Sequence, residues 1–180
     1  MKYLIISGNP KNDGLCRSVQ DEIERGARDG GAEVRVITAE NFDRCRVCGG
    51  GWGSCRESHR CAFGGDGFDD AQDAVRDADA VCIITPVYWG EVTESLKCFL
   101  DRLRRCEFGQ NGALSGKPAL LVASPGGSGN GMVSCMDQLD RFCRHVGAEI
   151  FDYIGINRKN CEYKRAAAYL AAKAMVQKPT

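Results

Sequence analysis

The chain has 180 residues, in which 24 Lys and Arg balance 24 Asp and Glu, so its formal net charge is zero. That balance argues against the basic surface that nucleic acids or anionic membranes attract, and no apolar run approaches the roughly 18 residues that span a bilayer. A chain of this length is expected to fold as a single domain. Its first residues show no secretory leader, so we expect a cytoplasmic protein.

Apolar strands alternate with amphipathic helices along the chain. The segment at 80–84 is apolar at every position, as expected of a strand covered on both faces. The predicted strands are Lys2–Ser7, Glu33–Thr38, 81–85, Pro118–Ser124 and 148–156, and the predicted helices are 18–28, 68–79, 94–105, Met132–Val146 and 164–176. This alternation predicts an α/β three-layer sandwich with a five-stranded parallel sheet in the order 2-1-3-4-5.

One stretch, at about 41–67, has no regular pattern and is too long for an ordinary connection. It is rich in cysteine and glycine. We therefore predict a single domain over residues 1–180 with a Cys-rich insertion at about 41–67.

Three loops should converge at the carboxyl edge of the sheet, where ligands bind in open α/β folds. The first joins a strand to the amino end of a helix, which is a natural anion site, and it lacks the Walker pattern of nucleoside triphosphate enzymes. A monophosphate would fit there; the alternative is a plain connecting turn. The candidate phosphate residues are Ser7, Asn9, Lys11, Gly14 and Cys16.

The second loop carries two aromatic side chains, Tyr88 and Trp89, between Pro86 and Gly90. Flat rings at this edge are suited to stacking on a flat ligand. The alternative is that both rings pack in the core or at a dimer interface.

The third loop is rich in glycine and serine, so its backbone N–H groups can approach a ligand closely. Because Met132 stands where a last glycine would be required, it is not a dinucleotide fingerprint. The alternative is a flexible surface loop. The candidate residues are Ser124, Gly126, Gly127 and Gly129.

Residues 86–90 (Pro-Val-Tyr-Trp-Gly) and 96–102 (Leu-Lys-Cys-Phe-Leu-Asp-Arg) resemble the NAD(P)H-dependent FMN reductase superfamily, closest to its iron–sulfur flavoprotein-like branch. The resemblance implies a flavodoxin-like fold, FMN bound by the three loops, and NAD(P)H as co-substrate. It also implies a homodimer or homotetramer. The first loop departs from the family pattern, because Asn9 replaces a serine, Lys11 an arginine, Leu15 an asparagine and Cys16 a threonine.

Four of the eleven cysteines gather in the insertion, at Cys45, Cys48, Cys55 and Cys61. Thiolates at such spacing bind zinc or iron–sulfur clusters. The related flavoproteins carry a compact four-cysteine motif here, usually with a second gap of two residues, whereas this chain has six. An iron–sulfur cluster, a zinc site that includes Cys61 or His59, a redox-active Cys45/Cys48 pair and free thiols all remain open.

The other cysteines are given no chemistry. Cys82, Cys135 and Cys143 are expected to be structural core residues, because free cysteine behaves as a small apolar side chain. Cys16 is interpreted in the same way, although a thiol at a helix amino end could be reactive. Cys98, Cys106 and Cys161 receive no role.

The leading hypothesis is an FMN-dependent oxidoreductase that passes electrons from NAD(P)H or a reduced carrier to a small acceptor such as a quinone, or to a redox protein. The first alternative is a non-enzymatic flavin and iron–sulfur electron carrier. The second is a metal-binding sensor without flavin. A response regulator is excluded because Thr85 and Pro86 stand where that class needs an aspartate.

Overall fold

A computed structural model describes residues 1–108 and 112–177, and its sheet is the predicted one. The five strands are all parallel in the order β2-β1-β3-β4-β5, so both the sheet and its order are confirmed. The strands are β1 (Lys2–Ser7), β2 (Glu33–Thr38), β3 (Ala80–Pro86), β4 (Pro118–Ser124) and β5 (Glu149–Gly155). The helices are α1 (Gly14–Asp29), α2 (Cys55–Ser58), α3 (Phe68–Asp77), α4 (Glu94–Cys106), α5 (Met132–Val146) and α6 (Cys161–Gln177).

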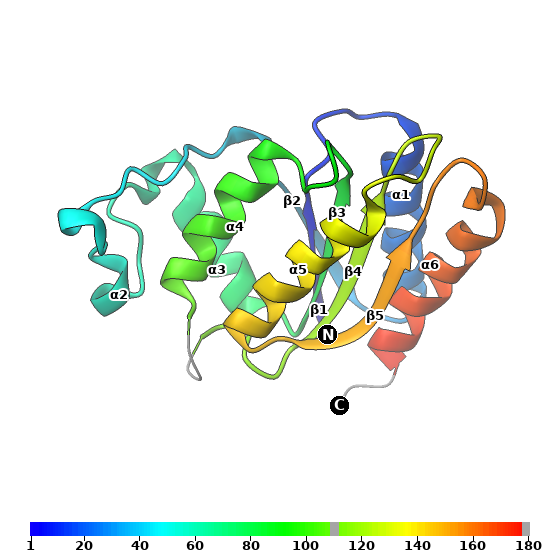
Figure 1. Cartoon of the computed structure of the whole chain (residues 1–180). Coiled ribbons are helices and arrows are strands. Elements are labelled where there is room, and N and C mark those ends of the chain that lie inside the picture. Colours follow the sequence, from blue (N-terminus) through cyan, green and yellow to red (C-terminus); the bar gives the residue numbers. More distant parts are fainter. Residues whose placement is uncertain (109–111, 178–180) are drawn as a thin grey trace.

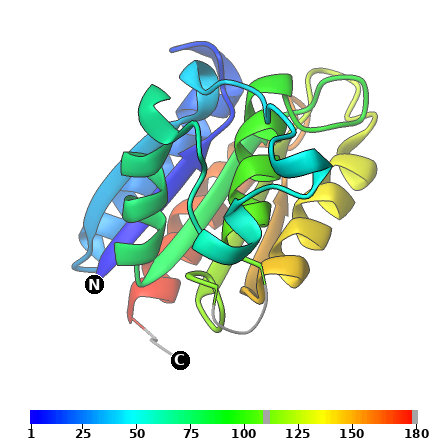
Figure 2. The same ribbon diagram turned by 90° about the vertical axis from the view of Figure 1, so that its left-hand side faces the viewer.

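The sheet lies between two helical layers (Figures 1 and 2). Successive side chains of each strand enter opposite cores, so Leu4 and Ile6 pack toward α3, α4 and α5, while Tyr3 and Ile5 pack toward α1 and α6. Because both faces are covered, the central strands β1, β3 and β4 are buried almost throughout. The expected core cysteines Cys82, Cys135 and Cys143 are fully buried.

Two helices begin earlier than predicted, α1 at Gly14 and α6 at Cys161. The apolar pair that predicted α1, Val19 and Ile23, lies after its first turn, although Leu15 and Cys16 of that turn also pack against the core. The edge strand β5 is also irregular, because a bulge shifts its register against β4 between Ala119 and Leu120.

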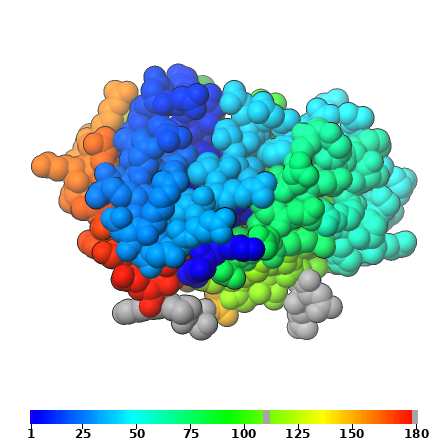
Figure 3. All heavy atoms as spheres, turned by 180° about the vertical axis from the view of Figure 1, so that it is seen from behind, coloured from blue at the N-terminus to red at the C-terminus, as the bar shows by residue number. Residues whose placement is uncertain are grey.

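The Cys-rich insertion lies outside α4, at the end of the molecule opposite α6 (Figures 1 and 3). It consists of extended chain, 3-10 turns and the single-turn helix α2. Arg102 of α4 joins it to the domain by donating hydrogen bonds to the carboxylate of Asp66 and the carbonyls of Asp43 and Phe63. Within the part of the chain that the structure describes, no helix is long and apolar enough to cross a membrane.

Candidate functional site

The loops after β1, β3 and β4 meet at the carboxyl edge of the sheet (Figure 1). The first two are tied together, because Gly8 N–H donates to the carbonyl of Ile84 at 2.8 Å and Thr93 Oγ1 donates to the carbonyl of Gly8 at 2.8 Å. Thr93 N–H also reaches the buried Thr85 hydroxyl at 3.3 Å. The edge is therefore a connected surface and not three separate loops.

The first loop presents an unused polar group. Asn9 is 8% exposed, and among the described residues its side-chain Nδ2 has no hydrogen-bond partner. Two other polar atoms of Asn9 already have partners. Its backbone N–H donates to Ser7 Oγ at 3.4 Å, and its side-chain Oδ1 accepts from Lys11 N–H at 3.2 Å. A buried amide without a partner is costly, so this one fits a missing acceptor.

The amino end of α1 strengthens this anion site. Asp13 is the extended residue before the helix, and its side chain makes no capping hydrogen bond to any described residue. The first turn holds no acidic side chain, so the free N–H groups and the helix dipole remain available to an anion. Lys11 is exposed on the same loop.

Cys16 lies in the first turn of α1, directly after this loop. Its side chain is buried in the core beneath α1, and burial raises the pKa of the thiol to about 12. The nearby Ser18 hydroxyl donates a hydrogen bond to the carbonyl of Leu15 at 2.8 Å.

The second loop is a tight hairpin turn. Tyr88 and Glu91 exchange two backbone hydrogen bonds of 2.9 Å, and the two residues between them, Trp89 and Gly90, both have positive φ, at 52° and 83°. This is the type I′ pattern, in which a bulky side chain is strained. Tyr88 is 45% exposed and Trp89 is completely exposed, so the alternative that both rings pack in the core is wrong.

The third loop packs directly on the second. Val87 N–H donates to the carbonyl of Ser124 at 3.2 Å, and Ser134 Oγ donates to the carbonyl of Gly90 at 2.6 Å. A Cβ atom on Gly131 would collide with the Cα of Gly90, so the two backbones touch. Gly126 and Gly127 instead face open space, because a methyl group added to either would have no described heavy atom within 4 Å.

The four cysteines of the insertion line one small cavity, and a fifth, Cys106 from the end of α4, lines it with them. Cys55 and Cys106 are buried, whereas Cys45, Cys48 and Cys61 are half-buried. Among the described residues, no three Cys, His, Asp or Glu side chains are already arranged around a metal position. We call this space, lined by the five cysteines, the thiol cavity.

Two arginines of α4 also face the thiol cavity. Arg102, which is 2% exposed, places Nη2 at 3.4 Å from Cys61 Sγ. Arg105 donates to the carbonyls of Gly51 and Trp52 at 3.1 and 2.8 Å. The Nε atoms of both arginines are buried without a partner among the described residues, and Arg102 is paired through its other nitrogens with the Asp66 carboxylate.

The thiols differ in their environments. Backbone hydrogen bonding from Ser54 lowers the pKa of the Cys48 thiol, and Arg105 acts in the same direction. Burial, together with the nearby Cys55 and Cys61, raises the pKa of the Cys106 thiol to about 12. His59 does not line the cavity, and its Nδ1 bonds the Cys106 carbonyl at 2.8 Å. The zinc alternative that includes His59 is therefore disfavoured.

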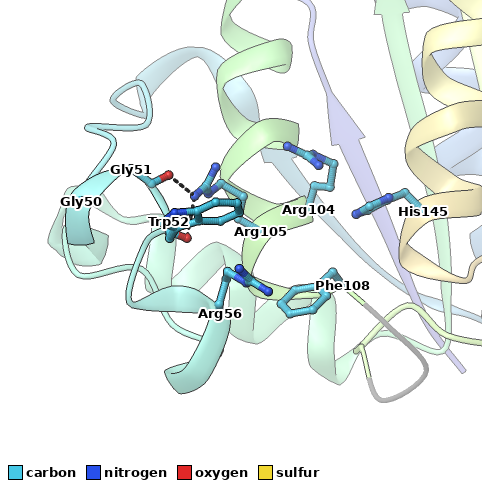
Figure 4. Close-up of a pocket in the computed structure, with 8 residues that line it drawn as sticks. All are labelled: Gly50, Gly51, Trp52, Arg56, Arg104, Arg105, Phe108 and His145. Carbon is cyan, nitrogen blue, oxygen red and sulfur yellow. Dashed lines mark hydrogen bonds between the residues drawn. The ribbon is translucent and has the colours of Figure 1, made fainter.

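A larger pocket of about 450 Å³ adjoins the insertion (Figure 4). Arg104 and His145 approach it from α4 and α5, and the exposed Trp52 covers it from the insertion. None of the loop residues predicted to bind a ligand lines this pocket. It is lined by Gly50, Gly51, Trp52, Arg56, Arg104, Arg105, Phe108 and His145.

Prediction from sequence missed Cys106, Arg102 and Arg105. A signal was present, since Arg102 and Cys106 lie three and seven positions after Phe99, on the apolar face of the helix. A buried arginine on such a face needs an acidic or polar partner.

The chain resembles known proteins both in sequence and in structure. The family model described as NADPH-dependent FMN reductase matches residues 1–160. The iron–sulfur flavoprotein of Methanosarcina thermophila is 32% identical over 136 residues, which are 73% of this chain and 66% of that protein. The iron–sulfur flavoprotein of Archaeoglobus fulgidus is 29% identical over 119 residues, 65% of this chain and 51% of that protein. These matches thus span about half to two thirds of the relatives' length.

Solved structures share the fold. An NADH:FMN oxidoreductase in its apo form superposes with a TM-score of 0.70 at 20% identity, covering 98% of this chain and 88% of that one. An NAD(P)H:quinone oxidoreductase from Methanothermobacter marburgensis gives a TM-score of 0.70 at 18% identity, covering 98% and 94%. The family match carries the assignment, and the chain belongs to the NADPH-dependent FMN reductase family, in the branch of the iron–sulfur flavoproteins.

Proposed function

We propose that the chain is an FMN-dependent oxidoreductase that takes electrons from NAD(P)H or a reduced carrier and passes them to a small acceptor such as a quinone. The observation that carries the proposal is the carboxyl edge itself. A buried amide without a partner, a free helix amino end and two exposed aromatic rings lie on one connected set of loops. Family membership supports the same conclusion.

FMN would lie across the three loops. Its phosphate would accept hydrogen bonds from Asn9 Nδ2, from Lys11 and from the backbone N–H groups around Gly14. Ser7 and the backbone of Cys16 would lie close to the phosphate. Its ring would lie beside Pro86, Tyr88, Trp89 and Gly90, with its polar edge toward Ser124, Gly126, Gly127 and Gly129. The flavin supplies the electron chemistry, while the protein binds it, orients it and excludes competing reactions.

The thiol cavity would hold an iron–sulfur cluster or zinc through cysteines drawn from Cys45, Cys48, Cys55 and Cys61. A centre bound by four thiolates carries net negative charge, and Arg102 and Arg105 supply positive charge beside it. The glycines between Cys48 and Cys55 adopt positive φ, which lets this short segment wrap around a centre. We place the protein in the cytoplasm, where eleven thiols stay reduced.

Trp89 and Tyr88 would be covered by the flavin and by a second copy of the chain in a homodimer or homotetramer. Large exposed aromatic side chains are typical of such sites. The electron acceptor would be a small molecule or a redox protein.

Steady-state oxidation of NADH and NADPH, with a quinone or ferricyanide as acceptor, tests the proposal. Turnover that depends on added FMN supports the enzyme. The second candidate, a flavin and iron–sulfur electron carrier, is favoured by the thiol cavity. It predicts that the flavin is reduced by an electron-carrying protein and that neither nucleotide supports turnover.

A further inference from the structure

The thiol cavity holds five cysteines, one more than a four-thiolate centre requires. Four of them come from the insertion, and Cys106 comes from the last turn of α4. We infer that Cys106 is a ligand of the metal centre proposed for this cavity, on which the inference rests. One of the four insertion cysteines is therefore dispensable for metal binding.

The position of Cys106 is the first argument. Its side chain is 1% exposed and lines the cavity together with Cys55 and Cys61. Ligands on a regular helix are held more rigidly than ligands on a loop. The insertion cysteines Cys45 and Cys48 instead precede the run Gly49-Gly50-Gly51, whose backbone is conformationally permissive, so they can move toward a centre that α4 fixes.

The backbone around Cys106 is anchored from several sides. Its carbonyl bonds His59 Nδ1 at 2.8 Å. The neighbouring Glu107 is buried, and its carboxylate accepts from Arg76 Nε and from the N–H of Ala113, both at 2.8 Å, and also from Gln72. Such outer contacts are the kind that orient a metal ligand.

Charge is the second argument. The side chain of Arg102 faces the cavity and is 2% exposed, and its Nε has no hydrogen-bond partner among the described residues. A methyl group on Gly53 would lie 3.0 Å from Cys55 Sγ and 3.1 Å from Arg105 Nη2, so the second guanidinium also lies beside a thiol. Arg102 is itself paired with Asp66, so Arg105 is the guanidinium that brings positive charge to the side of the cavity where Cys106 lies.

Cysteine-to-alanine variants of the full chain test the inference one ligand at a time. Each variant at Cys45, Cys48, Cys55, Cys61 and Cys106 is reconstituted anaerobically, with ferrous iron and sulfide or with zinc, and the bound metal and FMN are measured. Cys143→Ala is the matched control, because Cys143 is equally buried but lies on α5 and does not line the cavity. Thermal unfolding of the metal-free variants checks that they fold.

We expect Cys106→Ala to lose at least roughly tenfold in metal affinity, as Cys55→Ala does, while Cys143→Ala and one insertion variant keep the wild-type metal content. If Cys106→Ala does not fold, Cys106→Ser repeats the measurement with the smallest change. Wild-type metal content in a folded Cys106 variant overturns the inference. A wild-type protein that binds FMN but neither iron nor zinc also overturns it and leaves the flavin function standing.

Discussion

Arg102 binds Asp66 through both carboxylate oxygens, at 2.6 and 3.1 Å, and this ion pair fastens the Cys-rich insertion to α4. The geometry is bidentate, which is the strong form of a guanidinium–carboxylate pair. Because Arg102 also forms one wall of the thiol cavity, the pair links the stability of the insertion to the geometry of the cysteines.

Asp66→Asn should loosen the insertion strongly. The substitution leaves the guanidinium of Arg102 buried without its counter-charge, which costs about 3 kcal/mol in comparable buried pairs. We expect a lower unfolding temperature and faster proteolysis within 42–67. Asp43→Asn is the matched control, since the Asp43 carboxylate pairs with Arg46 at the exposed surface and its loss should change little. Equal behaviour of the two variants would contradict this role.

The same pair should make stability depend on pH. Burial acts to raise the pKa of Asp66, but hydrogen bonds from Arg102 and from the N–H of Asp43 outweigh it, so the pKa lies below its ordinary value. The unfolded chain therefore binds this proton more readily than the folded one. The stabilisation is present above the ordinary carboxyl pKa and is lost as pH falls through the lowered value. Denaturant unfolding should show that the difference in free energy of unfolding between wild type and Asp66→Asn narrows from neutral to acid pH. A difference that stays constant with pH would contradict this role of the Asp66 carboxylate.

Asn9→Ala should weaken FMN without weakening riboflavin. Its unpartnered Nδ2 is proposed to donate to the phosphate, and a hydrogen bond to a charged group contributes about 2 kcal/mol, or roughly thirtyfold in affinity. Fluorescence titration with both ligands measures the difference. Asn12→Ala, at an exposed position of the same loop, is the control. A parallel loss of riboflavin affinity would show that Asn9 shapes the loop instead.

Trp89→Ala should weaken FMN and riboflavin equally, because the indole is proposed to lie beside the ring that both share. Aromatic contacts contribute about 1 kcal/mol beyond buried area, so a loss of roughly fivefold or more is expected. Trp52→Ala is a control on the insertion, where the indole is 70% exposed and far along the chain from the three loops. If Trp89→Ala bound FMN and riboflavin as tightly as the wild type, the indole of Trp89 would not be part of the flavin site.

Gly131→Ala should disrupt the contact between the second and third loops. Its Cβ would collide with the Cα of Gly90, and its φ of 76° is strained for alanine. We expect FMN affinity to fall at least roughly fivefold, because overpacking a close contact typically costs about 1 kcal/mol or more. Gly65→Ala is the matched control, because it adds the same methyl group in open space at ordinary φ and lies in the insertion, outside the three loops. Isothermal titration with FMN compares the two, and similar affinities would mean that this contact does not hold the site together.

The sheet could be predicted because each of its central strands has its own local signal. Runs such as Leu4-Ile5-Ile6 identify buried parallel strands, and the alternation with helices restricts the strand order to a few possibilities. The starts of α1 and α6 were predicted too late, because polar neighbours separate the few apolar side chains of their first turns, such as Cys16 and Cys161, from the apolar pattern that follows.

The details of the site depend on contacts between distant segments. The contact of Gly131 with Gly90 arises only once the neighbouring strands β3 and β4 bring their loops together. Cys106 likewise reaches the thiol cavity because the insertion folds back against α4 (Figure 2). Helical spacing places Cys106 on the apolar face of α4, but it does not show that the insertion lies against that face, so the sequence could indicate the cysteines of the insertion but not that Cys106 joins them.

The FMN content of the anaerobically purified chain, before and after incubation with FMN, tests the central claim most directly. We predict that each chain binds an FMN, that the flavin absorbance is bleached by NADH or NADPH, and that a quinone restores it. A folded protein with no flavin absorbance even after added FMN would contradict the account and leave a metal-binding protein without flavin.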